Sequence, residues 1–215
     1  MNKIIIFGES DIGLGILKIF PMATIIPKEM CDVRNFDAVQ KIIQKHNPDV
    51  VINCAGISHI QPVKLSDLNS WYEEIEVNLH GSYNIAKASI ENNENSIIIF
   101  FASVAGKYGK PFHSGYCASK SAVISLTQSL AMEGYRAFSI SPGRVDTKMR
   151  EKDFPGEDKR TRLSVDEVAV VVGKCIDGKY ISGDNVVIRK RGFRKLSRID
   201  RGQPWKHYLN VTPIK

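Results

Sequence analysis

The sequence predicts a single domain of the α/β class, in which helices cover both faces of a doubly wound parallel sheet. Short apolar runs rich in β-branched residues alternate with segments of helical periodicity, which is typical of strands buried on both faces. Glycine-containing or polar turns follow several of these runs. The length of 215 residues suits one α/β domain with a sizeable core, so a second domain is not required.

The individual elements follow from these patterns in chain order. We expect strands over residues 3–7, 23–26, 49–53, 96–101 and 135–140, and a last strand within ISGDNVVIRKRG. We expect helices after the first glycine turn and over residues 36–46, 68–91, 115–133 and 164–177. Asn35 and Ser164 can cap two of these helices, because their side-chain oxygens accept hydrogen bonds from first-turn N–H groups. Val39 and Ile43 recur at helical spacing and should face the sheet.

The excess positive charge lies in the carboxyl-terminal tail. The chain has a formal net charge of +7, of which residues 189–215 contribute +8 and the first 188 residues −1. Such a tail can bind phosphate or nucleic acid, and aromatic residues such as Trp205 could stack on bases. Without a recognised module we do not expect nucleic-acid binding. We expect residues 193–215 to form a basic extension that covers a neighbouring subunit, not a separate domain.

The four cysteines predict reduced thiols. They lie far apart, without metal-type spacing, whereas a secreted scaffold usually carries a denser set; they are Cys31, Cys54, Cys117 and Cys175. The apolar run before Gly8 is too short for a signal-peptide core, and no apolar run approaches the ~18–20 residues of a membrane span. We therefore expect a cytoplasmic protein with no membrane association and no metal site.

Tyr116 and Lys120 form the central chemical pair of the sequence. On a helix, residues i and i+4 share one face, so the hydroxyl and the ammonium can reach the same small volume. A nearby cation favours the phenolate, so we expect Lys120 to lower the pKa of Tyr116 from ~10 toward neutral pH, where it could act as general acid or base. Taken alone, such a pair is more often part of a solvated helix face.

Ser103 gives this pair a context. It directly follows the apolar run SIIIFFA, the position of a side chain that leaves the carboxyl end of a buried strand. In open α/β sheets that edge is where ligands bind.

Together these residues resemble the short-chain dehydrogenase/reductase family. The resemblance covers roughly residues 3–188 and implies a Rossmann-like fold. Five motifs carry it in order: NCAG at Asn53 to Gly56, Asn78 within IEVNLHG, Ser103, Tyr116 with Lys120, and Pro142-Gly143 followed by Thr147.

The resemblance also implies an activity and a role for each catalytic residue. The activity is NAD(P)-dependent transfer of a hydride between nicotinamide and a carbonyl or secondary alcohol. Tyr116 would give or take the proton, and Lys120 would lower its pKa and hold the nicotinamide ribose. Ser103 would hydrogen-bond the carbonyl oxygen, and Asn78 would complete a proton relay.

A dinucleotide site is a further implication of the resemblance. The cofactor residues that it assigns are Gly8, Ser10, Asp11, Ile12, Gly13, Lys28, Asp32, Val33, Asn53, Ala55, Gly56, Tyr116, Lys120, Pro142, Gly143, Val145 and Thr147. The family spacing is Gly-x-x-x-Gly-x-Gly, whereas the first gap here holds one more residue. Glu9 and Asp11 also place negative charge where a diphosphate would lie. The loop is therefore expected to be reshaped or weakened, and a turn that only packs a helix is the alternative.

The cofactor side is shortened as well. Only residues 27–31 separate the second strand from Asp32-Val33, which resemble the family's adenine-contacting pair. The family's usual helix and much of its third strand are missing, so we expect a sheet trimmed at its second/third strand edge. Lys28 slightly favours NADP over NAD, although an ordinary surface lysine explains it as well.

The charged segment REKDFPGEDKRTRL stands where the family has its substrate lid. An apolar sterol or long acyl chain would need more apolar cover, so we expect a small, polar substrate. His113 could contact this substrate, or it could simply be exposed. The helix over residues 115–133 forms part of the family's subunit interface, which implies a homodimer or homotetramer.

Two other functions remain open from the sequence. A nucleotide-sensing or scaffold protein on the same fold would explain the altered glycine loop, although it would have little use for all four catalytic-type residues. An epimerase or dehydratase that retains NAD would keep the same residues.

Overall fold

The computed structural model describes residues 2–190; the predicted tail over residues 193–215 and the last two residues of the segment ISGDNVVIRKRG lie outside these residues. The described chain forms a six-stranded parallel sheet with the order β2-β1-β3-β4-β5-β6. The strands are β1 (Ile4–Phe7), β2 (Thr24–Ile26), β3 (Val50–Asn53), β4 (Ile97–Phe101), β5 (Arg136–Pro142) and β6 (Asn185–Ile188). The α-helices are α1 (Asp11–Ile19), α2 (Phe36–His46), α3 (Leu68–Ile75), α4 (Gly81–Asn92), α5 (Ser114–Met132), α6 (Lys148–Asp153) and α7 (Val165–Ile176).

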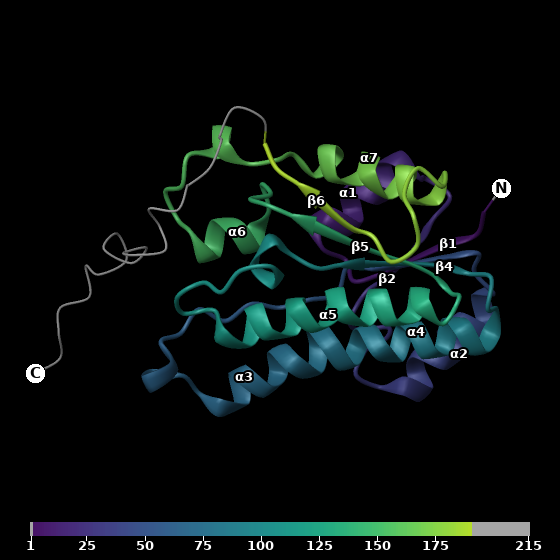
Figure 1. The fold of residues 1–215 in the computed structure, drawn as a ribbon, viewed down its shortest axis with the longest axis horizontal. Coiled ribbons are helices and arrows are strands. Elements are labelled where there is room, and N and C mark those ends of the chain that lie inside the picture. Colours follow the sequence, from purple (N-terminus) through teal and green to yellow (C-terminus); the bar gives the residue numbers. More distant parts are fainter. Residues whose placement is uncertain (1, 191–215) are drawn as a thin grey trace, which may run out of the picture.

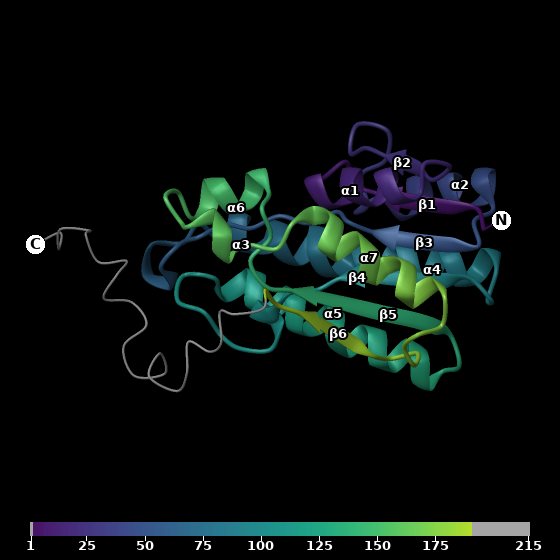
Figure 2. The same cartoon turned by 90° about the horizontal axis from the view of Figure 1, so that it is seen from above.

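Helices cover both faces of this sheet. In Figures 1 and 2, α1 and α7 lie on one face, and α2, α4 and α5 lie on the other. Successive side chains of β1 point alternately into the two layers: Ile4 and Ile6 pack with the α1/α7 side, Ile5 and Phe7 with the α2/α4 side. Each strand must therefore be apolar at nearly every position, which is why the sequence shows continuous apolar runs. The predicted doubly wound α/β fold is confirmed.

The sheet ends early on the β2 side, as the sequence predicts. β2 pairs with β1 alone and occupies the edge. Residues 27–35 form only turns before α2 begins, and no strand lies between β2 and α2.

The long helix expected over residues 68–91 contains a wide π-helical turn at Glu76–His80, between α3 and α4. Asn78 lies in this turn. Its amide holds the loop after β3, since Oδ1 accepts from the backbone N of Ile57 at 2.9 Å and Nδ2 donates to Ile57 O at 3.0 Å. π-helical turns are often found at functional sites.

Two predicted helix caps are present. Asn35 accepts a hydrogen bond from the N–H of Ala38 at the start of α2. Ser164 and Glu167 form a reciprocal capping box at the start of α7.

The predicted lid segment contains α6, which lies beyond the carboxyl ends of the strands (Figure 1). Among residues 2–190, no helix combines the length and apolar character that crossing a bilayer requires.

Candidate active site

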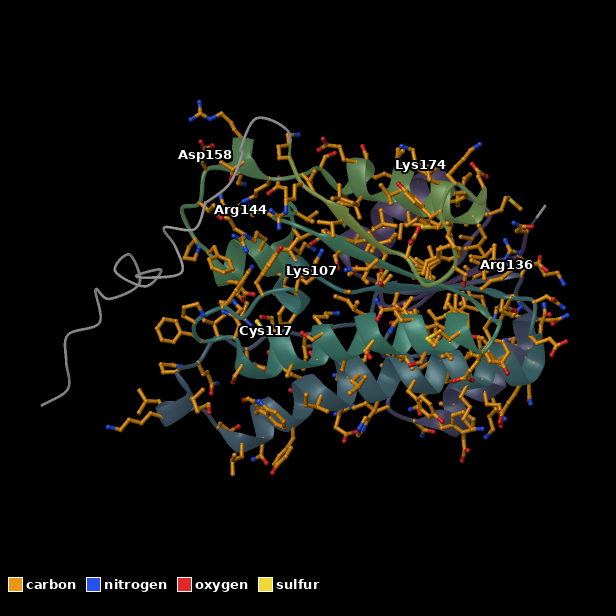
Figure 3. The ribbon with its side chains drawn as sticks, viewed as in Figure 1. Lys107, Cys117, Arg136, Arg144, Asp158 and Lys174 are labelled. Carbon is orange, nitrogen blue, oxygen red and sulfur yellow. The ribbon has the colours of Figure 1, made fainter. Side chains whose placement is uncertain are left out.

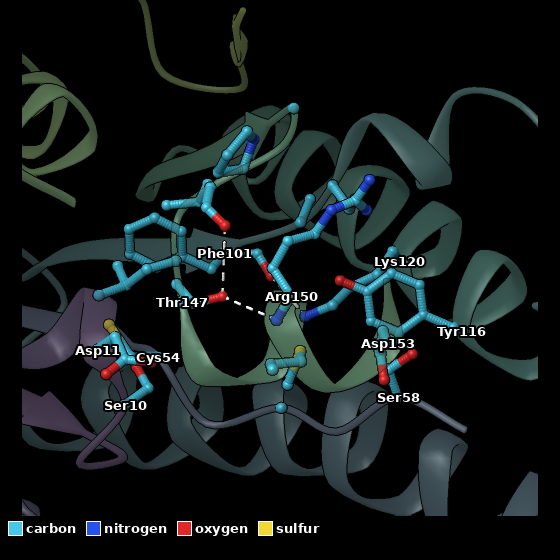
Figure 4. A pocket seen from close by; sticks show the side chains of 18 of the residues that line it. Ser10, Asp11, Cys54, Ser58, Phe101, Tyr116, Lys120, Thr147, Arg150 and Asp153 are labelled. Carbon is cyan, nitrogen blue, oxygen red and sulfur yellow. Dashed lines mark hydrogen bonds between the residues drawn. The ribbon is translucent and has the colours of Figure 1, made fainter. Parts of the chain in front are cut away.

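A cleft opens at the carboxyl edge of the sheet (Figure 4) and encloses about 980 Å³, part of it open to solvent. Residues that follow β1, β3, β4 and β5 line it, together with α5 and α6. Its lining consists of Ser10, Asp11, Ile12, Cys54, Ala55, Gly56, Ser58, Phe101, Ala102, Ser103, Lys110, His113, Tyr116, Lys120, Pro142, Gly143, Val145, Thr147, Met149, Arg150, Asp153 and Phe154. Most of the predicted site residues are thus brought to one cavity, at the edge where open α/β sheets bind ligands.

Ser103, Tyr116 and Lys120 converge within this cleft. The Ser103 and Tyr116 side chains are hydrogen-bonded to each other. Lys120 Nζ lies 5.7 Å from the centre of the Tyr116 ring and donates to Phe101 O at 2.7 Å. The Lys120 ammonium is thereby anchored to the last residue of β4. Ser103, whose side chain provides the hydroxyl, follows just after the end of the same strand.

The protonation equilibria differ from the sequence prediction. Burial raises the pKa of Tyr116 to about 12, and the hydrogen bond with Ser103 opposes this only in part. Burial also lowers the pKa of Lys120 to about 8. The predicted lowering of the Tyr116 pKa is therefore wrong for this structure: desolvation of the phenol outweighs any benefit from the neighbouring cation. The phenol is protonated at neutral pH.

Asn78 is fully buried and bonded on all sides by the protein. Besides Ile57, its Nδ2 donates to Ser119 Oγ at 3.0 Å, and its backbone oxygen accepts from Ser82 Oγ at 2.6 Å. A Cβ atom placed on Gly56 would lie 3.2 Å from Asn78 Oδ1 and 3.3 Å from Lys120 Nζ. Gly56 therefore separates the amide from the ammonium, and a side chain there would crowd both.

The glycine-rich turn has two functions. Gly8 has φ +94°, and a Cβ on it would lie 2.7 Å from the N of Ala55. A Cβ on Gly13 would lie 2.6 Å from Gly8 O, so these two glycines permit the tight turn. Gly15 instead packs against Val165 of α7. The alternative of a helix-packing glycine thus applies to Gly15.

The turn also delivers a carboxylate to the cleft. Ser10 caps α1 by accepting from the N–H of Gly13 at 3.1 Å. Asp11 is the first residue of α1, lines the cleft, and accepts from the backbone N of Lys148 at 2.7 Å. A negative charge thus stands at the helix end that most favours anions.

Several predicted cofactor residues lie outside the cleft lining. Lys28 is exposed in the turn after β2, and Asp32 binds the Arg34 guanidinium through both carboxylate oxygens. Val33 is a core residue packed against Gly81. Asn53 is buried; its Oδ1 accepts from the N of Ala55 and its Nδ2 donates to Ser82, so it shapes the turn after β3.

His113 lies in the cleft wall. Only 7% of its surface is exposed, its Nδ1 lies 2.7 Å from Pro111 O, and its ring stacks on Phe154 with centroids 5.8 Å apart. Burial lowers its pKa. Simple exposure of His113, one of the two sequence readings, is therefore wrong.

Sequence reasoning missed a buried carboxylate beside the site. Glu74 of α3 is 2% exposed and accepts from the backbone N–H groups of Tyr116 and of His59, the latter at 2.7 Å. Burial raises its pKa. Glu74 thus ties the first turn of α5 to the loop after β3. Glu74 lies in a helix with several polar residues, so the sequence alone did not indicate that its carboxylate is buried and accepts these two hydrogen bonds.

The lid segment is held by ion pairs around a buried guanidinium. The Arg162 side chain has no exposed surface and contacts the carboxylates of Asp146, Glu151 and Glu157. Glu157 also pairs with Arg144 and Arg150. This network fixes the segment that carries α6 over the cleft.

Comparison with known proteins agrees with the geometry. The model of the family described as short chain dehydrogenase matches residues 24–158, so the chain belongs to this family. The chain is 33% identical over 136 residues to the Thermotoga maritima 3-oxoacyl-[acyl-carrier-protein] reductase FabG, covering 60% of this chain and 55% of the relative.

Other similar proteins extend this comparison. An uncharacterized oxidoreductase of Staphylococcus epidermidis is 30% identical over 177 residues, covering 78% of this chain and 76% of the relative. The solved structure of a 4-hydroxyisoleucine dehydrogenase complexed with NADH superposes with a TM-score of 0.71 at 27% identity, covering 87% of this chain and 96% of that one. The match to the reductase of Thermotoga maritima spans little more than half of that relative's length.

Proposed function

We propose that this protein is an NAD(P)-dependent oxidoreductase that transfers a hydride between nicotinamide and a carbonyl or secondary alcohol of a small, polar substrate. The observation that carries the proposal is the convergence of Ser103, Tyr116 and Lys120 in one cleft at the carboxyl edge of the sheet. Family membership supports it.

The residues of the cleft fit a dinucleotide in most respects. Gly8 and Gly13 leave no room for side chains at the turn, and the first turn of α1 presents backbone N–H groups beside it. Ala55, Gly56, Pro142 and Gly143 keep the strand ends open to a planar group. Asp11 opposes a diphosphate, so we expect affinity to be modest. A bound NAD(P) would supply or accept the hydride.

The proton is handled by this chain's own residues. Because the Tyr116 phenol is protonated at neutral pH, it is suited to donate a proton to the carbonyl oxygen as that oxygen gains charge. Ser103 would donate a hydrogen bond to the same oxygen. The Lys120 ammonium then stabilises the phenolate that remains, since it lies over the same ring. A protonated phenol is the form that acts as the acid when a carbonyl is reduced.

The wider assignments belong to the same proposal. We expect one domain over residues 1–192, a cytoplasmic location, and a homodimer or homotetramer. The four cysteines are free and buried, which suits a reducing compartment. Exposed apolar side chains on α3, including Leu68 and Tyr72, suit a subunit interface. Lys28 slightly favours NADP over NAD.

The direct test combines cofactor binding with turnover. We expect NADPH or NADH to bind the purified full-length chain, and Tyr116→Phe to lower kcat at least about 100-fold with little change in cofactor affinity. Tyr83→Phe, at a half-exposed tyrosine of α4, is the matched control and should leave kcat unchanged. Near-normal turnover by Tyr116→Phe would remove the assignment.

A scaffold or nucleotide-sensing protein is the second candidate, and the Asp11 carboxylate in the cleft is the observation that favours it. Such a protein would not turn over carbonyl substrates with either dinucleotide. An epimerase or dehydratase would instead keep NAD through purification, which mass spectrometry of the isolated protein would reveal.

A further inference from the structure

The cleft has a cationic wall and a carboxylate wall, which come from different elements. Lys110 comes from the loop between β4 and α5, and Asp153 comes from the last turn of α6. Figure 4 shows Asp153 with Ser58, Tyr116 and Lys120 toward one end of the cavity, and Ser10, Asp11 and Cys54 toward the other. Asp153 therefore lies at the end that holds the candidate proton donor. Lys110 is near the same residues, since its charge and that of Asp153 both act on His113.

The carboxylate wall is already engaged. The Asp153 side chain is hydrogen-bonded to Ser58, and its charge acts to raise the pKa of Tyr116. An anionic group placed on this side would meet both Asp153 and the developing charge of the substrate oxygen. The Asp153 charge therefore disfavours an anion on this side of the cavity.

The cationic wall has a free charge. Arg150 is occupied: its Nε donates to Glu157 Oε2 at 2.8 Å, and its guanidinium lies 3.7 Å from the centre of the Phe154 ring. Arg144 also pairs with Glu157. Within residues 2–190, Lys110 is in no ion pair, although it lines the cavity.

Lys110 is also poorly solvated. Burial lowers its pKa, and the positive charges of Arg150 and Arg144 act in the same direction, while Cys117 and the Glu157 carboxylate, with which Lys110 is not paired, oppose this only in part. A charged amine that has lost water without gaining a carboxylate is stabilised when an anion binds beside it. The desolvated ammonium in the cavity thus favours an anionic ligand group beside Lys110, and the Asp153 carboxylate disfavours one on its own side.

We propose that Lys110 binds an anionic group of the substrate, a carboxylate or a phosphate, so that the substrate's carbonyl points toward Ser103 and Tyr116. This inference rests on the proposed function and narrows its polar substrate to an anionic carbonyl compound. It makes Lys110 a specificity-determining residue that takes no part in proton transfer.

The test uses pairs of substrates that differ only in charge, with the full-length protein and NADPH or NADH. The carboxylate pair is 4-oxopentanoate and its methyl ester; the phosphate pair is dihydroxyacetone phosphate and dihydroxyacetone. The wild type should prefer one anionic member by kcat/KM. Lys110→Met should lower kcat/KM for that member about 10- to 100-fold, mainly through KM, and change the neutral member less than about threefold. Lys110→Arg should retain most of the preference.

Lys107→Met is the matched control. Lys107 lies on the same loop (labelled in Figure 3) but is exposed and outside the cavity lining, so the same loss of charge should leave both pairs unchanged. A second measurement needs no turnover: succinate or inorganic phosphate, titrated by calorimetry, should bind the wild type more tightly than Lys110→Met.

The outcomes separate this inference from the proposed function. The inference would be overturned if Lys110→Met lowered kcat/KM equally for the charged and the neutral member of a pair, or if the wild type showed no preference for the charged member. In either case, turnover itself would still support the proposed oxidoreductase activity. Absence of dinucleotide binding and of turnover with all four compounds would overturn both. The pair that responds identifies the anion as carboxylate or phosphate.

Discussion

Replacing Gly8 by alanine tests the turn on which the cofactor site depends. Gly8 has φ +94°, and a Cβ there would lie 2.7 Å from the N and 2.9 Å from the Cα of Ala55. The positive φ costs an L-residue ~1–2 kcal/mol, and forcing backbone apart in a packed site costs ~1–3 kcal/mol more. We expect Gly8→Ala to lower the free energy of unfolding by ~2–5 kcal/mol.

Gly134 provides the matched control. It has φ +97°, close to that of Gly8, but a Cβ there would have no heavy atom within 4 Å. Gly134→Ala should therefore cost only the ~1–2 kcal/mol of backbone strain. Urea unfolding followed by circular dichroism measures both variants, and NADPH titration should show weakened binding for Gly8→Ala alone. If Gly8→Ala is no more destabilising than Gly134→Ala, the close approach to Ala55 is refuted.

Two further predictions concern the buried ionisable groups. Folded Lys120 releases its proton near pH 8, whereas the unfolded chain holds it to about 10.5, so the wild type should gain up to about 3 kcal/mol relative to Lys120→Met as pH rises through this window. Urea unfolding at several pH values checks this, and a difference that does not vary with pH would contradict it. Glu74→Leu leaves the N–H groups of His59 and Tyr116 without their acceptor and should cost ~1–3 kcal/mol per group, whereas Glu74→Gln retains an acceptor oxygen and should cost less. Equal destabilisation by the two variants would show that Glu74 acts through its charge alone.

The sequence predicts the sheet well because burial on both faces leaves a direct pattern. The runs around Ile5, Val51 and Ile99 are apolar at every position because neighbours of each residue face opposite helix layers. The missing strand after β2 is predictable from the resemblance, since only residues 27–31 separate the second strand from the Asp32-Val33 pair, too few for a crossover helix.

The electrostatics of the site were less predictable. The four-residue spacing of Tyr116 and Lys120 shows that they share a helix face, but it does not show how far the cavity is desolvated. That depends on α6 and on the loops after β3 and β4, which come from distant parts of the sequence. The sign of the Tyr116 pKa shift was therefore wrong, although the residue's position in the cleft was not.

Contacts between segments that are far apart in the chain could not be predicted from the sequence either. The π-helical turn depends on the amide of Asn78 reaching the backbone of Ile57, 21 residues away. Lys110 and Asp153 lie in segments that read as an ordinary loop and a charged surface stretch. Only the folded chain brings them to one cavity.

The single carboxylate of Asp11 joins the two lips of the cleft, because it begins α1 and also receives the first N–H of α6. A phosphate arriving at α1 competes with Asp11 for the same positive helix end. One side chain therefore connects the part of the cavity suited to a phosphate with the start of the helix beside the candidate substrate end, while the ion pairs around Arg162 continue to hold that helix in place.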